Sequence, residues 1–429
     1  MSAPLSPRGR RTPAGPAIVG AVVIAATAAV AGIAVAIHLG KVEGPRAPAG
    51  SGAPATSSPA PTTSRASVTW HSVTVPSGLT PTGISCVSSS DCWVLGVTDV
   101  STNAPRSAVW NLSGTTWSRL SVPANGNLVA ITCVTTDDCW AVGGHYTVPP
   151  DDNDGVVQPL IEHDSGTGFT ITDIPQTTGD ADNLEAVTCA SEDDCWAVGS
   201  YAANSENGGD GLQHPLIEEY DGSGWRPIYV SGQPLNGDLR AVACVDAGDC
   251  WAVGSVVVGN DYAQLIEQYT GGGWTVVVGP DTEGTSAAGG LGAVTCTGPN
   301  DCWAVGSTNP PSTPTEETAQ PLIEHYTGGA WTVVSSPFVN AANGGGLSGI
   351  ACTSADACWA VGLAQGPLSD LMGTMPPNTV PPLFEQYTGA RWSLVSGFPE
   401  GDALTAISCV PDGVCYAAGT GLVETTADS

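Results

Sequence analysis

The sequence predicts an all-β fold: a seven-bladed β-propeller of four-stranded blades, closed by an N-terminal strand and preceded by one transmembrane helix. Three observations support this prediction: a repeated unit, strand-like segments within it, and an offset between the two ends of the repeat region. Seven times along the 429 residues, two cysteines separated by five residues recur, usually followed by Trp-Ala-Val-Gly. The copies start 47 to 57 residues apart, a period typical of propeller blades.

Each repeat contains four strand signals. The first is Leu-x-Ala-Val-x-Cys, as in 184–189, and the second is Cys-Trp-Ala-Val-Gly, as in 195–199. The third resembles Pro-Leu-Ile-Glu-His-Tyr at 321–326, and the fourth begins with tryptophan, as at 331–334. Short runs rich in Val, Ile, Trp and Tyr between turn residues favour strands. A Gly or Ala three residues before each first cysteine indicates that the first strand is innermost, where the blades converge.

The two ends of the repeat region are offset by one strand. It opens at Ser67 with a strand of the fourth type that contains Trp70, and it ends after a third strand at 422–424. The N-terminal strand therefore supplies the missing outer strand of the last blade. A solenoid would need end caps and no such offset, so the ring is preferred.

The cysteine pairs use all 14 cysteines of the chain. Because each pair flanks a short hairpin loop, we expect seven disulfides, each stabilising the fold by about 2 kcal/mol. An even number with none free also suits an oxidising compartment. The expected disulfides are Cys86–Cys92, Cys133–Cys139, Cys189–Cys195, Cys244–Cys250, Cys296–Cys302, Cys352–Cys358 and Cys409–Cys415.

The N-terminal part divides into three segments before the propeller at 67–429. A basic cytoplasmic tail covers 1–16, an uncharged signal anchor long enough to span a bilayer covers 17–39, and a Pro/Ala/Ser/Thr-rich stalk covers 40–66. Arginines in the tail indicate a single-pass plasma-membrane protein with a cytoplasmic N-terminus and the propeller outside. The alternative is a signal peptide cleaved near Ala34-Val35-Ala36, which would give a secreted protein.

Charge limits the class of partner. The formal net charge is -30, and only five of the 11 basic residues lie within the repeats. Such an acidic body repels phosphate backbones, so no nucleic-acid partner is expected.

The repeat resembles the kelch-like, galactose-oxidase-like blades of propellers, in the cysteine-stapled form seen in exported bacterial proteins. Trp140-Ala141-Val142-Gly143-Gly144 is similar to the kelch strand that ends in two glycines, and 218–225 is similar to the Tyr and Trp element that follows it. Serine usually replaces the second glycine, as at Ser200, Ser255 and Ser307, and the Tyr-to-Trp spacing is shorter than in kelch repeats. The resemblance implies the fold and leaves the function open.

The sequence contains no motif for a particular enzyme class. Five scattered arginines do not suit the arginine cluster of a sialidase, and no spare cysteine exists for a galactose-oxidase-like copper site. Neither Gly-x-Ser-x-Gly nor His-Glu-x-x-His occurs. A hydrolase or lyase that uses two carboxylates stays open, because acidic residues are abundant. The glutamate that recurs in the third strand, including Glu424, is interpreted as structural.

Candidate ligand-binding residues gather in the loops that vary between blades, since loops vary where function is adapted on a fixed scaffold. These loops and the links between blades emerge on one face of the disc, and no catalytic residue is predicted there. The acidic stretch at 151–155 suggests a possible Ca²⁺ site, with Asp151, Asp152 and Asp154 as ligands. Glu185 and Arg240, four residues before the first cysteine in adjacent blades, are expected to form an ion pair near the channel mouth. The ligand-binding candidates are His145, Asp151, Asp152, Asp154, Glu206, Asp210, His214, Glu185 and Arg240.

These observations favour a membrane-anchored extracellular recognition scaffold that is more consistent with binding than with catalysis. Its expected partner is an envelope or extracellular glycan or protein. Two alternatives remain: a carbohydrate-active hydrolase or lyase on the variable-loop face, and a structural partner of a membrane complex.

Overall fold

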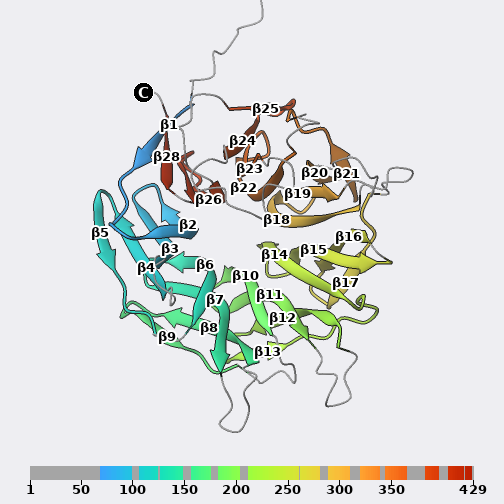
Figure 1. Cartoon of the computed structure of the whole chain (residues 1–429), viewed down its shortest axis with the longest axis horizontal. Helices are drawn as coiled ribbons and strands as arrows, with labels where there is room; N and C mark the ends of the chain where they lie inside the picture. Colours follow the sequence, from blue (N-terminus) through green and yellow to red (C-terminus); the bar gives the residue numbers. More distant parts are fainter. Residues whose placement is uncertain are drawn as a thin grey trace, which may run out of the picture. The chain divides into compact units, whose positions relative to one another are not determined.

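The fold was analysed in a computed structural model of the chain. The structure describes residues 68–98, 106–123, 126–147, 156–174, 182–202, 211–259, 261–280, 288–309, 319–338, 344–364, 382–395, 404–419 and 421–427. The described strands belong to one compact unit, Ser64–Ser429. They form seven four-stranded antiparallel sheets. Figure 1 shows these sheets arranged around a common centre.

Six of the sheets are blades of four strands consecutive in the chain. Blade 1 consists of β2 (Thr80–Ser88), β3 (Asp91–Thr98), β4 (Arg106–Ser113) and β5 (Thr116–Arg119). Blade 2 consists of β6 (Asn127–Thr135), β7 (Asp138–Thr147), β8 (Val156–Asp164) and β9 (Phe169–Ile171). Blade 3 consists of β10 (Asn183–Ser191), β11 (Asp194–Ala202), β12 (Gln213–Tyr220) and β13 (Trp225–Pro227). Blade 4 consists of β14 (Gly237–Asp246), β15 (Asp249–Val258), β16 (Asp261–Tyr269) and β17 (Trp274–Val277). Blade 5 consists of β18 (Ala288–Gly298), β19 (Asp301–Asn309), β20 (Gln320–Thr327) and β21 (Ala330–Val334). Blade 6 consists of β22 (Gly346–Ser354), β23 (Ala357–Leu363), β24 (Pro382–Tyr387) and β25 (Trp392–Leu394).

The seventh sheet is composite, and we call it the closing sheet. It contains β26 (Leu404–Cys409), β27 (Cys415–Gly419) and β28 (Leu422–Ala427), with β1 (Val68–Val73) paired to β28 as its outer strand. The first strands of successive sheets contact one another in the order β2, β6, β10, β14, β18, β22 and β26, and β26 contacts β2 again. This cycle of contacts closes the ring and confirms that the first strand of each repeat is innermost.

The prediction for the fold needs one correction, which concerns the third strand of the closing sheet. In the closing sheet Val423 lies opposite Ala417 and Glu424 lies opposite Tyr416, so Glu424 does not occupy the position of the glutamates in the other third strands. The elements that the structure describes are all strands, and the predicted transmembrane helix is not among them. Accordingly, no helix in the part of the chain that the structure describes could span a bilayer. The predicted anchor at 17–39 and the stalk at 40–66 lie outside the described residues.

The core consists of apolar clusters that lie between neighbouring sheets. The tryptophan of each Cys-Trp-Ala-Val-Gly strand packs edge-on against the outer-strand tryptophan of the next sheet, as Trp196 does against Trp274 with ring centroids 5.2 Å apart. At the closure Trp359 of blade 6 meets Trp70 of β1 in the same way, at 5.4 Å. Edge-to-face aromatic pairs contribute about 1 kcal/mol beyond their buried area. Tryptophan pairs of this kind therefore join neighbouring sheets at five of the seven junctions of the ring. At the other two, Trp93 packs in one cluster with Phe169, and Tyr416 packs in one cluster with Trp117.

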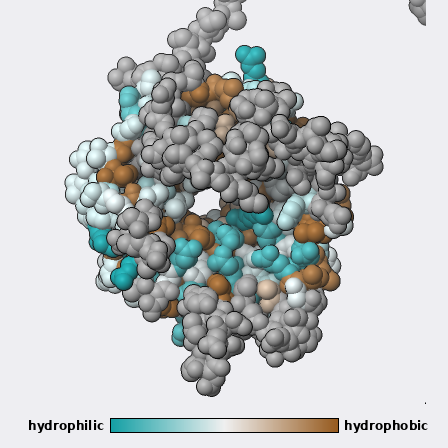
Figure 2. All heavy atoms as spheres, viewed as in Figure 1, coloured by the Kyte–Doolittle hydropathy of each residue, from teal (hydrophilic) through white to brown (hydrophobic). Residues whose placement is uncertain are grey.

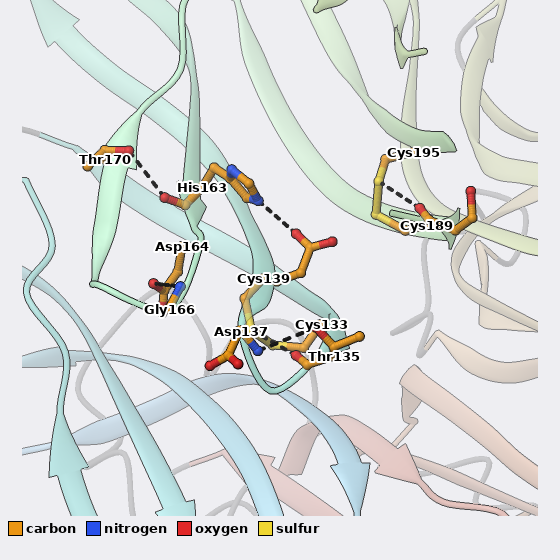
Figure 3. A network of polar contacts seen from close by, with 12 residues as sticks. Cys133, Thr135, Asp137, Cys139, His163, Asp164, Gly166, Thr170, Cys189 and Cys195 are labelled. Carbon is orange, nitrogen blue, oxygen red and sulfur yellow. Dashed lines mark hydrogen bonds and ion pairs between the residues drawn. A yellow bond between two sulfur atoms is a disulfide. The ribbon is translucent and has the colours of Figure 1, made fainter. Parts of the chain in front are cut away.

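The expected disulfides are present in all seven hairpins. Figure 3 shows the Cys133–Cys139 bridge at the base of its hairpin, with His163 on the neighbouring strand. His163 stacks on Trp140 with ring centroids 3.9 Å apart, and its Nε2 lies 2.7 Å from Asp138 Oδ1. The aspartate before the second cysteine thus ties the second strand to the third, in addition to its predicted place at the turn.

Candidate functional site

The variable-loop face is the face on which first strands begin and second strands end. Of the predicted ligand-binding residues, His145, Glu185, His214 and Arg240 are described, and all four lie at strand ends on this face. The other candidates, Asp151, Asp152, Asp154, Glu206 and Asp210, lie outside the described residues. Within the described parts of the chain no group of three or more His, Cys, Asp or Glu side chains could hold a metal ion.

Every innermost strand has a β-bulge near its start, which leaves one residue per sheet without a partner in the second strand. In β10 the register passes from Leu184 opposite Gly199 directly to Ala186 opposite Val198, so Glu185 is the extra residue. Bulges of this kind leave one residue unpaired and redirect its side chain. The seven bulge residues are Thr82, Val129, Glu185, Arg240, Gly292, Ser348 and Thr405.

The glycine of Trp-Ala-Val-Gly makes room for this bulge. A Cβ atom on Gly199 would lie 1.9 Å from the carbonyl oxygen of Asn183, and one on Gly254 would lie 2.0 Å from that of Asp238. The backbone of the first strand therefore passes directly over the end of the second strand at a distance that only glycine allows. This contact fixes the strand segment that carries the bulge residue.

Arg240 is held in place by two neighbours. Its Nε donates to Asp238 Oδ2 at 2.5 Å, and its Nη2 donates to Ser255 Oγ at 3.2 Å. The buried Ser255 hydroxyl in turn donates to Asp238 Oδ1 at 2.5 Å. A guanidinium fixed from two sides loses little freedom when it binds a ligand, so its remaining donors are preorganised.

The predicted ion pair between Glu185 and Arg240 is wrong. Arg240 pairs with Asp238, two residues before it in the same strand. Glu185 accepts a hydrogen bond of 2.6 Å from Asn183 Nδ2. Each charged bulge residue is therefore bound by a side chain at the entrance of its own strand, and both remain exposed to solvent.

Two cavities lie beside these residues. The larger has a volume of about 500 Å³, and its lining includes the bulge residues of four successive blades. The smaller, of about 250 Å³, shares Arg240, Gly290 and Ser307 with it and extends to Tyr262. Figure 2 shows hydrophilic residues gathered beside the central opening. We call the two cavities together the channel-mouth site. The larger cavity is lined by Glu185, Asp238, Arg240, Gly290, Gly292, Gly306, Ser307, Leu347 and Ser348.

The two predicted histidines lie on the same face but do not line these cavities. His145 is half-buried opposite Gln158, and its Nδ1 is buried without a hydrogen-bond partner among the described residues. His214 stacks on Tyr201 with ring centroids 5.0 Å apart. The structure thus joins Glu185 and Arg240 in one site and leaves the histidines outside it.

The glutamates that recur in the third strands are buried between sheets, away from the cavities. Glu218 lies opposite Ala197, whose small side chain leaves space for the carboxyl, and neither residue is exposed. Burial raises the pKa of the Glu218 and Glu324 carboxyls to about 8. It raises the pKa of the Glu162, Glu267 and Glu385 carboxyls to about 7. Gln233 Nε2 donates to Glu267 Oε1 at 2.9 Å from the link preceding blade 4.

Sequence reasoning missed Asp238, Ser255 and Tyr262 as site residues. One signal was available for Ser255, because serine repeatedly replaces the second kelch glycine. In the structure Ser255 holds Arg240, Ser307 lines both cavities, and Ser200 accepts a hydrogen bond from Gln213 at 2.7 Å. The position after Trp-Ala-Val-Gly therefore supplies a hydroxyl that makes a hydrogen bond or lines a cavity in three successive blades.

No protein family model and no curated protein match the chain. Several solved structures share its fold. A structure of YCF48 bound to D1 peptide is 14% identical, with 84% of this chain and 97% of that chain covered and a TM-score of 0.50. A streptogramin B lyase is 12% identical, with 84% and 98% covered and a TM-score of 0.52. Hydrazine synthase from Kuenenia stuttgartiensis is 13% identical, with 83% and 98% covered and a TM-score of 0.50.

Proposed function

We propose that this protein is a recognition module, and that its extracellular ligand docks on the variable-loop face at the channel-mouth site. The preorganised Arg240, held by Asp238 and Ser255 at the edge of a cavity of about 500 Å³, carries this proposal. A volume of this size falls within the range of known ligand pockets. The ligand class is an envelope or extracellular glycan or protein.

The arrangement of carboxyls supports binding over catalysis. A glycosidase needs one carboxyl that keeps its proton and a second that is free to act as base or nucleophile. The carboxyls with a strongly raised pKa, such as Glu218, are buried between sheets, where a substrate has no access. Both oxygens of Asp238, in the cavity, are occupied by Arg240 and Ser255. A hydrolase or lyase would nevertheless reveal itself through sugar release from a polysaccharide.

Structures with this fold include one that binds a peptide and one named as a lyase. The propeller therefore accommodates both binding and catalysis, and the choice for this chain depends on its own site. The kelch-like character of the repeat is likewise a proposal, since the solved structures reported above belong to other propeller families.

Anchoring, location and calcium complete the proposal. The uncharged segment at 17–39 would hold the propeller outside the plasma membrane on its stalk, unless cleavage releases it. A stable membrane partner that co-purifies with the chain would instead favour a structural role. Ca²⁺ would bind at Asp151, Asp152 and Asp154, and replacing these three residues with asparagine should then abolish any calcium dependence of binding.

The test is a binding assay with the full chain in a non-glycosidic detergent. Immobilised envelope polysaccharides and extracellular proteins are offered in parallel, each with calcium and with a chelator. Ser348→Tyr places a bulky ring in the larger cavity, while Ser118→Tyr places it on an exposed outer strand. We expect saturable binding that Ser348→Tyr abolishes and Ser118→Tyr preserves. Equal binding by both variants, or no saturable binding to any polysaccharide or protein, would refute the proposed recognition at this face.

A further inference from the structure

We infer that the channel-mouth site binds an uncharged oligosaccharide, with one sugar hydrogen-bonded to Arg240 and the next packed against Tyr262. This inference rests on the proposed function and adds the chemical class and the placement of the ligand. Its basis is the continuity of the two cavities, their charge and the nature of their lining.

The two cavities form neighbouring subsites on either side of Arg240. Both are lined by Arg240, Gly290 and Ser307, so the guanidinium lies where they meet. A Cβ atom on Gly290 would lie 3.3 Å from Arg240 Nη1. The absence of a side chain at Gly290 therefore leaves room for the guanidinium close to the backbone. A chain of two or more linked rings suits such a paired arrangement better than a single compact ligand.

The charges of the site disfavour an ionic ligand. Two carboxylates, Glu185 and Asp238, line the larger cavity together with one guanidinium. A carboxylate or phosphate on the ligand would approach Arg240 next to Asp238, which already neutralises it at 2.5 Å. A cationic ligand that enters both subsites would in turn meet the guanidinium between them. An uncharged ligand avoids both conflicts.

The free hydrogen-bonding groups suit hydroxyls. Arg240 Nη1 has no hydrogen-bond acceptor in the described structure, and it offers donors. Glu185 has one oxygen engaged by Asn183 and a second oxygen that can accept. Ser307 and Ser348 add hydroxyls on neighbouring blades. Since a hydroxyl both donates and accepts, a sugar carrying several of them can satisfy these groups at once.

Among the described residues that line the site, the one aromatic side chain is that of Tyr262, and the aliphatic ones are Leu347 and Ala319. Protein partners anchor through side chains that fill apolar pockets, whereas Leu347 is the one apolar side chain among the described residues that line the larger cavity. Tyr262 lines the smaller cavity with half of its surface exposed, at 50%. An aromatic ring has an apolar face and a polar tip, which matches the alternating C–H and hydroxyl surfaces of a sugar ring. This lining favours a glycan over a peptide.

The inference is tested with defined probes and the full chain in a non-glycosidic detergent. The probes are neutral di- to tetrasaccharides of glucose, galactose, mannose and N-acetylglucosamine, their uronic-acid counterparts, and one acidic and one basic peptide. We expect saturable binding of at least one neutral oligosaccharide. Tyr262→Ala and Arg240→Lys should each weaken it at least tenfold, because a lysine keeps the charge but not the planar donor set.

Matched variants separate a lost contact from a lost fold. Tyr229→Ala removes another exposed tyrosine of the same face that lines neither cavity, and Arg391→Ala removes an exposed arginine at a distant hairpin. Both should bind like the wild type, with unchanged thermal melting for all four variants. Binding restricted to uronic acids or peptides would overturn the inference, as would neutral-sugar binding insensitive to Tyr262→Ala and Arg240→Lys. Protein binding lost on Ser348→Tyr, without oligosaccharide binding, would overturn it and leave the proposed function intact.

Discussion

Because five third-strand glutamates are buried, we predict that the free energy of unfolding falls as the pH rises above 4.5. Glu218→Gln is the variant that tests this prediction. The Glu218 carboxyl is fully buried opposite Ala197, and neither of its oxygens has a hydrogen-bond partner in the described structure. Burial raises its pKa from 4.5 to about 8. The folded protein therefore keeps this proton at neutral pH, whereas the unfolded chain releases it near pH 4.5.

The sign of the effect follows from the proton count. Between pH 4.5 and about 8 the folded state binds one more proton at Glu218 than the unfolded state, so the free energy of unfolding falls as pH rises. Each pKa unit corresponds to about 1.4 kcal/mol, which gives roughly 3 to 5 kcal/mol lost across this interval at this one position. Glu324, with a pKa of about 8, and the three glutamates near 7 act in the same direction.

The assay is denaturant unfolding of the wild type and of Glu218→Gln between pH 5 and pH 8.5. Glutamine keeps the shape and cannot ionise, so the variant should match the wild type at pH 5 and exceed it by a few kcal/mol at pH 8.5. Glu192→Gln, on an exposed hairpin of the same blade, is the control and should follow the wild type at every pH. A wild type that becomes more stable from pH 5 to 8, or a variant effect that is independent of pH, would refute the reasoning.

Three further predictions concern the scaffold. Trp70→Ala should lower the free energy of unfolding by about 3 to 5 kcal/mol, because it removes the ring that packs against Trp359 and leaves a cavity there. An unchanged free energy of unfolding would show that β1 does not contribute to closing the ring. Gly199→Ala should lower the melting temperature sharply, since its Cβ would lie 1.9 Å from a backbone oxygen, whereas Gly224→Ala, with nothing within 4 Å, should leave it nearly unchanged. Replacing Cys189 and Cys195 together with alanine should cost about 2 kcal/mol in denaturant unfolding, and no loss would show that the bridge is dispensable.

Sequence reasoning reached the four strands of each repeat and the disulfides because each leaves a periodic mark. Trp70 could be assigned to the closing sheet because the first strand lacks partners of its own repeat and the last repeat lacks a fourth strand. Glu424 shows the limit of this approach. Its place in the repeat depends on the register of β27 with β28, and a single-residue shift is invisible in a pattern of similar residues.

The site was only partly predictable, for a physical reason. Comparing the seven copies singled out Glu185 and Arg240, since charges at a position otherwise occupied by small or neutral residues stand out. Their partners could not be read in the same way, because a bulge changes which side chains meet. Arg240 reaches Asp238 and Ser255 through that local geometry, and these contacts replace the predicted pair with Glu185.

The closing sheet also sets the order of events during biosynthesis. β1 consists of residues 68–73, and its partner β28 consists of residues 422–427. The first strand of the propeller therefore stays unpaired until the last strand has been synthesised. Pairing across such a sequence separation is slow, because the entropy of closing the loop is lost before any contact compensates for it. A chain truncated at its C-terminus would retain an open edge next to Trp70 and expose it to proteases. Completion of this sheet therefore distinguishes finished chains from unfinished ones.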